Sequence, residues 1–158
     1  MEEILQKESQ AERLVKNLTA KKMRIAAAEA GTGGMFAQSL SAVPGAAAVF
    51  RCGVAVFDRD GMNRLAGVKK PVCRRYGLDS REAAIAMAEG IGRLDKAGVG
   101  IGVSAVDNGS LHTAVYLKSS PKTWMAVLTV EPFPNEELSH QRQRAVDGIF
   151  SLLNGYFD

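Results

Sequence analysis

The sequence is poor in cysteine and in long apolar runs, and each shortage excludes a class of protein. Two cysteines, Cys52 and Cys73, are too few for a disulfide scaffold or for a zinc site built from cysteine. No apolar run approaches the roughly 20 residues that a membrane-spanning helix requires. The first residues, Met1-Glu2-Glu3, are acidic where a secretory signal would be basic. We therefore expect a cytoplasmic protein with no membrane contact and with reduced thiols.

Charge of one sign is not in large excess either. Twenty Lys and Arg against 17 Asp and Glu leave a net charge of +3, which suits small anionic ligands but does not require nucleic acid. With 46% hydrophobic and 23% charged residues, the composition is that of an ordinary folded chain. A length of 158 residues suits one hydrophobic core. We expect residues 1–158 to form a single domain with no nucleic-acid partner.

Hydrophobic periodicity and turn residues predict an α/β fold. The predicted helices cover 3–22, 35–40, 62–66, 83–96 and a last segment capped by Asn135. The predicted strands cover 23–29, 46–57, 99–106, 111–118 and 124–130. Asp79 is the expected cap of the fourth helix, and Asn108-Gly109 is a strong hairpin signal. Strands and helices alternate in the first part of the chain, and a meander of strands follows. This order predicts a three-layer α/β/α sandwich with a mixed central sheet.

A glycine-rich turn joins the first predicted strand to the helix after it. The segment Ala28-Glu29-Ala30-Gly31-Thr32-Gly33-Gly34 would present backbone N–H groups and the positive end of a helix dipole to an anion such as phosphate. It has neither the Gly-Lys-Ser/Thr ending of a P-loop nor the Gly-x-Gly-x-x-Gly spacing of a dinucleotide fingerprint. Residue types alone therefore favour a plain structural turn over a phosphate site.

Several segments, taken in order, resemble the CinA C-terminal family. The glycine turn is similar to that family's A-E-S-C-T-G-G, Val43-Pro44-Gly45 to its V-P-G-S-S, and residues 50–62 to its F-x-G-G-V-V-x-Y-S-N-E-x-K. Ala66-Gly67-Val68 and the helix at 80–90 continue the resemblance, which covers most of residues 24–106. It implies a CinA C-terminal domain-like fold and hydrolysis of nicotinamide mononucleotide to nicotinic acid mononucleotide and ammonia in pyridine nucleotide salvage. It also implies no metal, no cofactor and a homo-oligomer.

The same resemblance places unreactive residues at the chemical positions of the family. Ala30 stands at the presumed nucleophilic serine, Phe57 at a tyrosine and Met62 at a lysine. None of these side chains can attack a carbonyl or relay a proton. The resemblance thus implies a catalytically inactive paralogue, a pseudoenzyme with no catalytic residue, that keeps a pocket for a nucleotide or another phosphate-bearing small molecule. The residues expected to line that pocket are Glu29, Gly31, Thr32, Gly33, Gly34, Asp58 and Ser104.

Two other interpretations stay open. The first is an active amidohydrolase on nicotinamide mononucleotide or a related substrate, with Thr32 or Ser104 supplying a hydroxyl and Asp58 acting as base. The second is an interaction protein with a collapsed pocket, because the family's long glycine-rich loop is reduced here to residues 107–110. Release of ammonia separates the first from the inactive paralogue, and failure of any nucleotide to raise thermal stability favours the second.

Three further features are predicted to be structural. The basic group Lys69, Lys70, Arg74 and Arg75 is interpreted as a solvated face. His112 and His140 lack the spacing of metal ligands, so no metal site is expected. The glycines at 98, 100 and 102 follow a helix and enter a strand, which is the wrong context for a dinucleotide and predicts close backbone packing.

Overall fold

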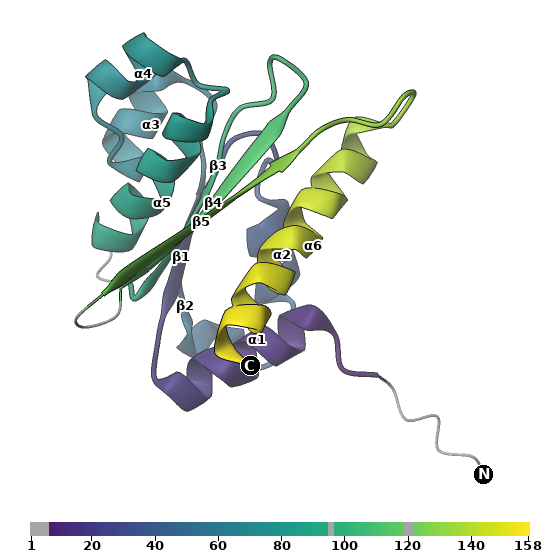
Figure 1. The fold of residues 1–158 in the computed structure, drawn as a ribbon. Helices are drawn as coiled ribbons and strands as arrows, with labels where there is room; N and C mark the ends of the chain where they lie inside the picture. The colour runs from purple at the N-terminus through teal and green to yellow at the C-terminus, as the bar shows by residue number, and fades with distance from the viewer. Residues whose placement is uncertain (1–6, 95–96, 119–121) are drawn as a thin grey trace.

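The computed structural model describes residues 7–94, 97–118 and 122–158, and these form a sheet between two layers of helices (Figure 1). The strand order is β2-β1-β3-β4-β5. The strands are β1 (Ile25–Glu29), β2 (Phe50–Ala55), β3 (Val99–Val103), β4 (Leu111–Lys118) and β5 (Thr123–Val130). β1 pairs in parallel with β2 and β3, whereas β4 and β5 continue the sheet antiparallel. The predicted three-layer α/β/α sandwich with a mixed sheet is confirmed.

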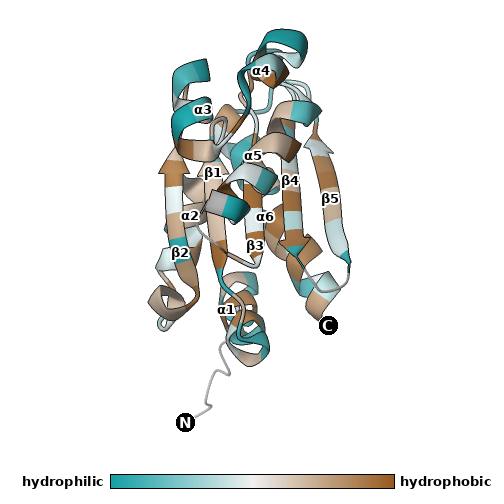
Figure 2. Ribbon diagram, turned by 90° about the vertical axis from the view of Figure 1, so that its left-hand side faces the viewer, coloured by the Kyte–Doolittle hydropathy of each residue, from teal (hydrophilic) through white to brown (hydrophobic). Residues whose placement is uncertain are grey.

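The helices divide between the two faces of the sheet. One face is covered by α1 (Gln10–Lys21), α2 (Met35–Ser41) and α6 (Leu138–Phe157), and the other by α3 (Arg59–Ala66), α4 (Lys70–Tyr76) and α5 (Arg81–Leu94) (Figure 1). Figure 2 shows hydrophobic strands in the middle and hydrophilic stretches on the outer helices. No helix in the described part of the chain is long and apolar enough to cross a bilayer.

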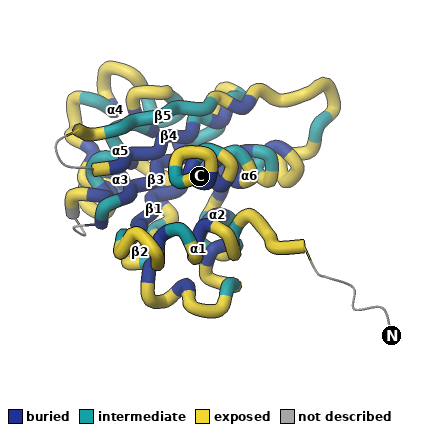
Figure 3. Tube along the Cα trace, turned by 60° about the horizontal axis from the view of Figure 1, so that its bottom comes forward, coloured by how far each residue is buried: buried dark blue, intermediate teal, exposed yellow. Residues whose placement is uncertain are grey.

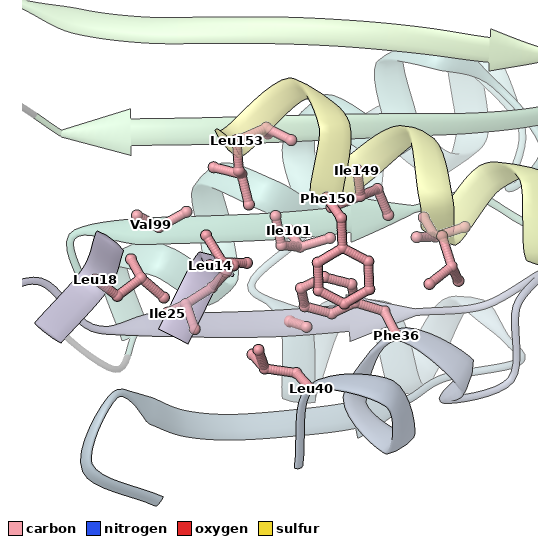
Figure 4. Packing of buried hydrophobic residues seen from close by; sticks show 14 of the residues in the cluster. Leu14, Leu18, Ile25, Phe36, Leu40, Val99, Ile101, Ile149, Phe150 and Leu153 are labelled. Carbon is pink, nitrogen blue, oxygen red and sulfur yellow. The ribbon is translucent and has the colours of Figure 1, made fainter. Parts of the chain in front are cut away.

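Large side chains fill the space under α1, α2 and α6. Leu14 and Leu18 of α1, Phe36 of α2 and Ile149 of α6 are fully buried against β1 and β3 (Figure 4). The rings of Phe36 and Phe150 lie 5.0 Å apart between their centroids. Figure 3 shows this burial as a dark band through the central strands. The first helix layer is therefore held by interdigitated aliphatic and aromatic groups.

On the other face of the sheet, α5 packs closely against β3 because β3 carries glycines there. A Cβ at Gly100 would lie 2.0 Å from the Ala88 carbonyl oxygen, and one at Gly102 would lie 2.1 Å from that of Ala84. Real Cβ atoms do not approach backbone so closely, so the helix can rest on β3 only because these residues are glycines. The close packing predicted for this glycine series is confirmed at both positions.

Several predicted boundaries are corrected by local hydrogen bonds. α1 begins at Gln10, since Ser9 and Glu12 form a capping box. Residues 3–6 of the predicted 3–22 helix and residues 95–96 of the predicted 83–96 helix lie outside the described residues. α5 is capped by Ser80 rather than Asp79, because the Ala83 N–H donates to the Ser80 hydroxyl at 3.1 Å. Both helices therefore start where a serine accepts from the first turn.

Other segments differ from the prediction because of their tertiary surroundings. Residues 46–48 form a 3₁₀ turn, and β2 is an edge strand with alternating exposure rather than a buried strand over 46–57. α4 was not predicted. Asn135 adopts a left-handed conformation with φ 60 and does not cap α6, which begins at Leu138 after Glu137.

Candidate functional site

The predicted site residues meet at one edge of the sheet, where three parallel strands end. The Ala30 N–H donates to the Val103 carbonyl at 2.9 Å, and the Gly31 N–H donates to that of Ser104 at 2.8 Å. The Val56 N–H donates to the Glu29 carbonyl at 2.9 Å on the other side. β1 has β2 and β3 as its two neighbours, so the glycine turn leaves the sheet at a point where the strand order reverses. Ligands of open α/β sheets bind at such points.

The N-terminus of α2 is already occupied by a carboxylate of this chain. Glu29 is 1% exposed, and its Oε1 accepts from the Phe36 N–H at 2.8 Å while its Oε2 accepts from the Ala37 N–H at 3.1 Å. These are the donors at a helix start that otherwise attract an external anion. Glu29 therefore binds the helix end, and a phosphate ligand would have to use the outer part of the turn.

The hydroxyl groups expected near the site have structural partners. Thr32 is 3% exposed and its hydroxyl donates to Glu29 Oε1 at 2.7 Å. The Ser104 hydroxyl donates to the Ala105 carbonyl at 2.9 Å and accepts from the His112 N–H at 3.1 Å, which joins the end of β3 to the start of β4. Both side chains thus stabilise the backbone around the turn.

Asp58 caps the helix that follows β2. Its Oδ1 accepts from the Gly61 N–H at 2.7 Å, in the position of an N-cap residue. The residue is exposed and begins α3 on the face opposite α2. Asp58 therefore has a local role, and the hydroxyl groups of Thr32 and Ser104 have other hydrogen-bond partners.

The inner and outer glycines of the turn differ in the space around them. A Cβ at Gly31 would lie 2.3 Å from Leu111 Cδ2 and 2.7 Å from the Ser104 carbonyl oxygen, so this position cannot carry a side chain without displacement. A Cβ at Gly33 or Gly34 would meet no heavy atom within 4 Å. These two residues have φ values of 60 and 100, which suit glycine. The outer turn is thus open to a ligand.

One cation reaches the turn from the far end of the sequence. The Nε of Arg142, on α6, donates to the Gly31 carbonyl at 2.7 Å across 111 residues of chain. Arg142 is half-buried and lies three and four residues before the buried Ala145 and Val146. A charged residue on an apolar helix face is the sequence signal for such a contact, but no local motif identifies its partner. Sequence reasoning missed Arg142 for that reason.

A polar cluster fixes the connection from β5 into α6. Glu136 has a side chain that is 3% exposed, and it accepts from Arg144 Nε at 2.8 Å, from Arg144 Nη2 at 2.5 Å and from the His140 ring. The Arg144 guanidinium also stacks 3.9 Å from the centre of the Phe133 ring. Hydrogen bonds from Arg144 lower the pKa of Glu136 to about 2, with smaller contributions from His140 and the Phe133 N–H. The cluster anchors the helix that carries Arg142.

A family model described as the CinA C-terminal domain matches residues 7–129. The chain belongs to the CinA C-terminal domain family. A CinA-like protein of Anaeromyxobacter dehalogenans is 34% identical over 120 residues, which cover 70% of this chain and 29% of that protein. Another CinA-like protein, from Anaeromyxobacter sp. strain K, is 37% identical over 100 residues, which cover 63% and 24%. The chain thus spans less than a third of the length of either relative.

Solved structures of the CinA superfamily share the fold. A CinA superfamily protein from Klebsiella pneumoniae has a TM-score of 0.82 at 20% identity, covering 94% of this chain and 95% of that one. The competence/damage inducible protein CihA from Agrobacterium tumefaciens has a TM-score of 0.81 at 20% identity, covering 92% of each chain. At this identity the likeness concerns the arrangement of strands and helices.

The three residues predicted to stand at the chemical positions of the family lie in contrasting surroundings. Ala30 is 4% exposed and Met62 is fully buried, and both belong to one apolar cluster that also contains Val56. Phe57 is 73% exposed and its ring lies outside this cluster. Among the described residues, no three His, Cys, Asp or Glu side chains come together as metal ligands.

Proposed function

We propose that this CinA-family chain is a non-catalytic relative of the nicotinamide mononucleotide amidohydrolases that binds a nucleotide or another phosphate-bearing small molecule. The observation that supports it is the packing of Ala30 and Met62 in one apolar core. A methyl group and a thioether offer neither a nucleophile nor a cation. Ala30 is 4% exposed and Met62 is fully buried, so neither side chain is placed to contact a substrate amide.

Arg142 and the outer glycines supply the binding half of the proposal. The guanidinium is held beside the turn by its Nε contact with the Gly31 carbonyl. Its remaining N–H groups form no hydrogen bond to another described residue, and a guanidinium fork suits the oxygens of a phosphate. Gly33 and Gly34 leave open space beside it. A phosphate at this place would lie outside the donors that Glu29 occupies.

Ammonia release and nucleotide binding test the two halves separately. The unaltered protein should release no ammonia from nicotinamide mononucleotide and should bind it saturably in calorimetry. Arg142→Gln should weaken that binding about tenfold, the usual loss for a hydrogen bond to a charged group. Arg93→Gln, near the C-terminal end of α5, removes the same charge and should leave the affinity unchanged. Ammonia release would refute the non-catalytic role, and equal affinities in the two variants would refute the role of Arg142.

A second candidate function, a hydrolase with rearranged residues, is favoured by one contact. The Thr32 hydroxyl donates to the Glu29 carboxylate at 2.7 Å, which is the geometry of a nucleophile and its base. Against it, Thr32 is 3% exposed and both Glu29 oxygens also accept from backbone N–H groups. Thr32→Val removes the hydroxyl at nearly constant volume. Ammonia release by the unaltered protein that disappears in this variant would establish the second function in place of the first.

A further inference from the structure

A second basic site lies on the other face of the sheet, between α3 and α4. A cavity of about 320 Å³ is lined there by Arg59, Asp60, Lys70, Cys73 and Arg74. Arg59 and Asp60 form the first turn of α3, and the other three residues lie on α4. Two short helices that both pack against α5 thus direct three cationic side chains toward one hollow. None of these residues lines the glycine turn.

The positive charge of this cavity is not compensated within the described part of the chain. The only carboxylate in the lining, Asp60, pairs with Arg64 at 3.4 Å. Arg59, Lys70 and Arg74 form no ion pair with any described residue. Like charges that share a concave surface raise its potential and favour the entry of an anion.

In the neighbouring cavity, a carboxylate offsets part of the positive charge of the lining. The cavity has a volume of about 430 Å³ and is lined by Lys69 and Arg93, but also by Glu89. Arg93 lies 4.0 Å from the Glu89 carboxylate. The basic segment that the sequence suggests to be one solvated face is therefore divided, with Lys69 in a nearly balanced cavity and Lys70 and Arg74 in an unbalanced one.

Cys73 does not supply the missing negative charge. Its side chain is 2% exposed, and burial raises the pKa of the thiol while the nearby Arg59 charge acts in the opposite direction. The thiol therefore stays protonated at neutral pH. The lining of the cavity at this point is neutral and weakly polar, and the surrounding cations remain available to a ligand.

We propose that the cavity between α3 and α4 binds a small organic phosphate through Arg59, Lys70 and Arg74. Its volume is at the lower end of the range of small-molecule sites, so it fits a compact phosphate ester rather than a polymer. Two guanidinium groups and one ammonium match the oxygens and the charge of a phosphate dianion. Cys73 and the aliphatic stems of the cations would contact the organic part of the ligand.

Titration with inorganic pyrophosphate tests the site. The titration would use full-length Arg142→Gln protein, so that the glycine turn does not contribute, at about 50 mM salt where screening is moderate. Amide resonances of residues 59–62, 70 and 72–76 should shift along one saturable curve. The Lys70→Gln, Arg74→Gln double variant should weaken binding at least about tenfold. The matched Lys69→Gln, Arg93→Gln variant removes equal charge from the balanced cavity and should change affinity less than about twofold.

Each other outcome overturns the proposal. Equal weakening in the two double variants would show non-specific attraction to a basic surface, and a non-saturable titration would show no site. Shifts confined to residues 31–34 would assign the anion to the glycine turn. Both variants change exposed residues, so unfolding temperatures equal to that of the parent protein are expected and confirm that the comparison concerns binding. Failure here leaves the proposed function intact, because that function depends on Arg142.

Discussion

The two faces of the sheet are packed by different means. Under α1, α2 and α6 the core consists of leucine, isoleucine, valine and phenylalanine side chains that fill the distance between helix and strand. Under α5 the glycines of β3 let the helix backbone nearly touch the strand, and Met87 and Ile91 of the helix pack beside that contact into a second apolar cluster. The first face is therefore held by large side chains, whereas the second combines large side chains with a backbone contact that only glycine permits. Ala30 and Met62 are buried on this second face.

Gly100→Val should have the largest effect, because it inserts three carbons where the Ala88 carbonyl leaves room for none. We expect a loss of at least about 4 kcal/mol in the free energy of unfolding, measured by urea denaturation. Gly155→Ala is the matched control: a Cβ there meets nothing within 4 Å, so stability should stay constant or rise by up to about 1 kcal/mol. Equal changes in the free energy of unfolding for the two variants would show that the contact between α5 and β3 does not depend on glycine.

Met62→Lys should be nearly as damaging, because the position is fully buried in an apolar cluster. An unpaired lysine there must be neutral in the folded state, which costs about 4 kcal/mol near neutral pH. Since the folded-state pKa of that lysine is depressed, part of the stability should return as pH rises toward 10. Met62→Leu should cost less than about 1.5 kcal/mol. A lysine variant as stable as the leucine variant would indicate that position 62 has access to water.

Leu14→Ala should cost about 3 kcal/mol, because the side chain is fully buried and the surrounding helices cannot collapse into the space. Leu65→Ala, at a position 52% exposed on α3, should change stability by less than about 1 kcal/mol. Thermal or urea unfolding would give both values. A small loss of stability in Leu14→Ala would mean that the core under α1, α2 and α6 relaxes to fill the space left by the side chain.

Glu136→Gln should have the smallest effect, and it should depend on pH. Because the pKa of Glu136 is lowered from 4.5 to about 2 in the folded chain, its stabilisation is present above about pH 4.5 and is lost as pH falls toward 2. The variant should therefore be less stable than the parent protein at pH 7, with the difference shrinking below pH 4.5. Urea midpoints at pH 7, 4 and 2 measure it, and a difference that stays constant would contradict the assignment.

Local signals in the sequence were sufficient for most of the fold. Periodicity placed β1, β3, β4, β5 and α5, and the glycine series predicted the close contact that Gly100 and Gly102 make. α4 was missed because its seven residues are mostly charged or short and give no apolar stripe. β2 was read as buried because its exposure depends on which strand lies beside it.

The candidate site was only partly accessible to the same reasoning. The glycine turn and its neighbours follow strands, so their shared position at one edge of the sheet could be predicted. That Glu29 would bind the start of α2, instead of lining a pocket, depends on the rotation of the helix about its axis. The contact of Arg142 with Gly31 joins residues 111 apart, and no local pattern specifies such a pair.

The bond from Glu29 to α2 also bears on the order in which the chain acquires its structure. It links residues seven and eight positions apart, so closing this loop costs little conformational entropy and can occur early. The Arg142 contact needs nearly the whole chain and should form late. We expect Glu29→Gln to slow folding and Arg142→Gln to accelerate unfolding, as stopped-flow kinetics would show. The turn would then be formed before Arg142 reaches it, so the last step of folding would also complete the proposed ligand site.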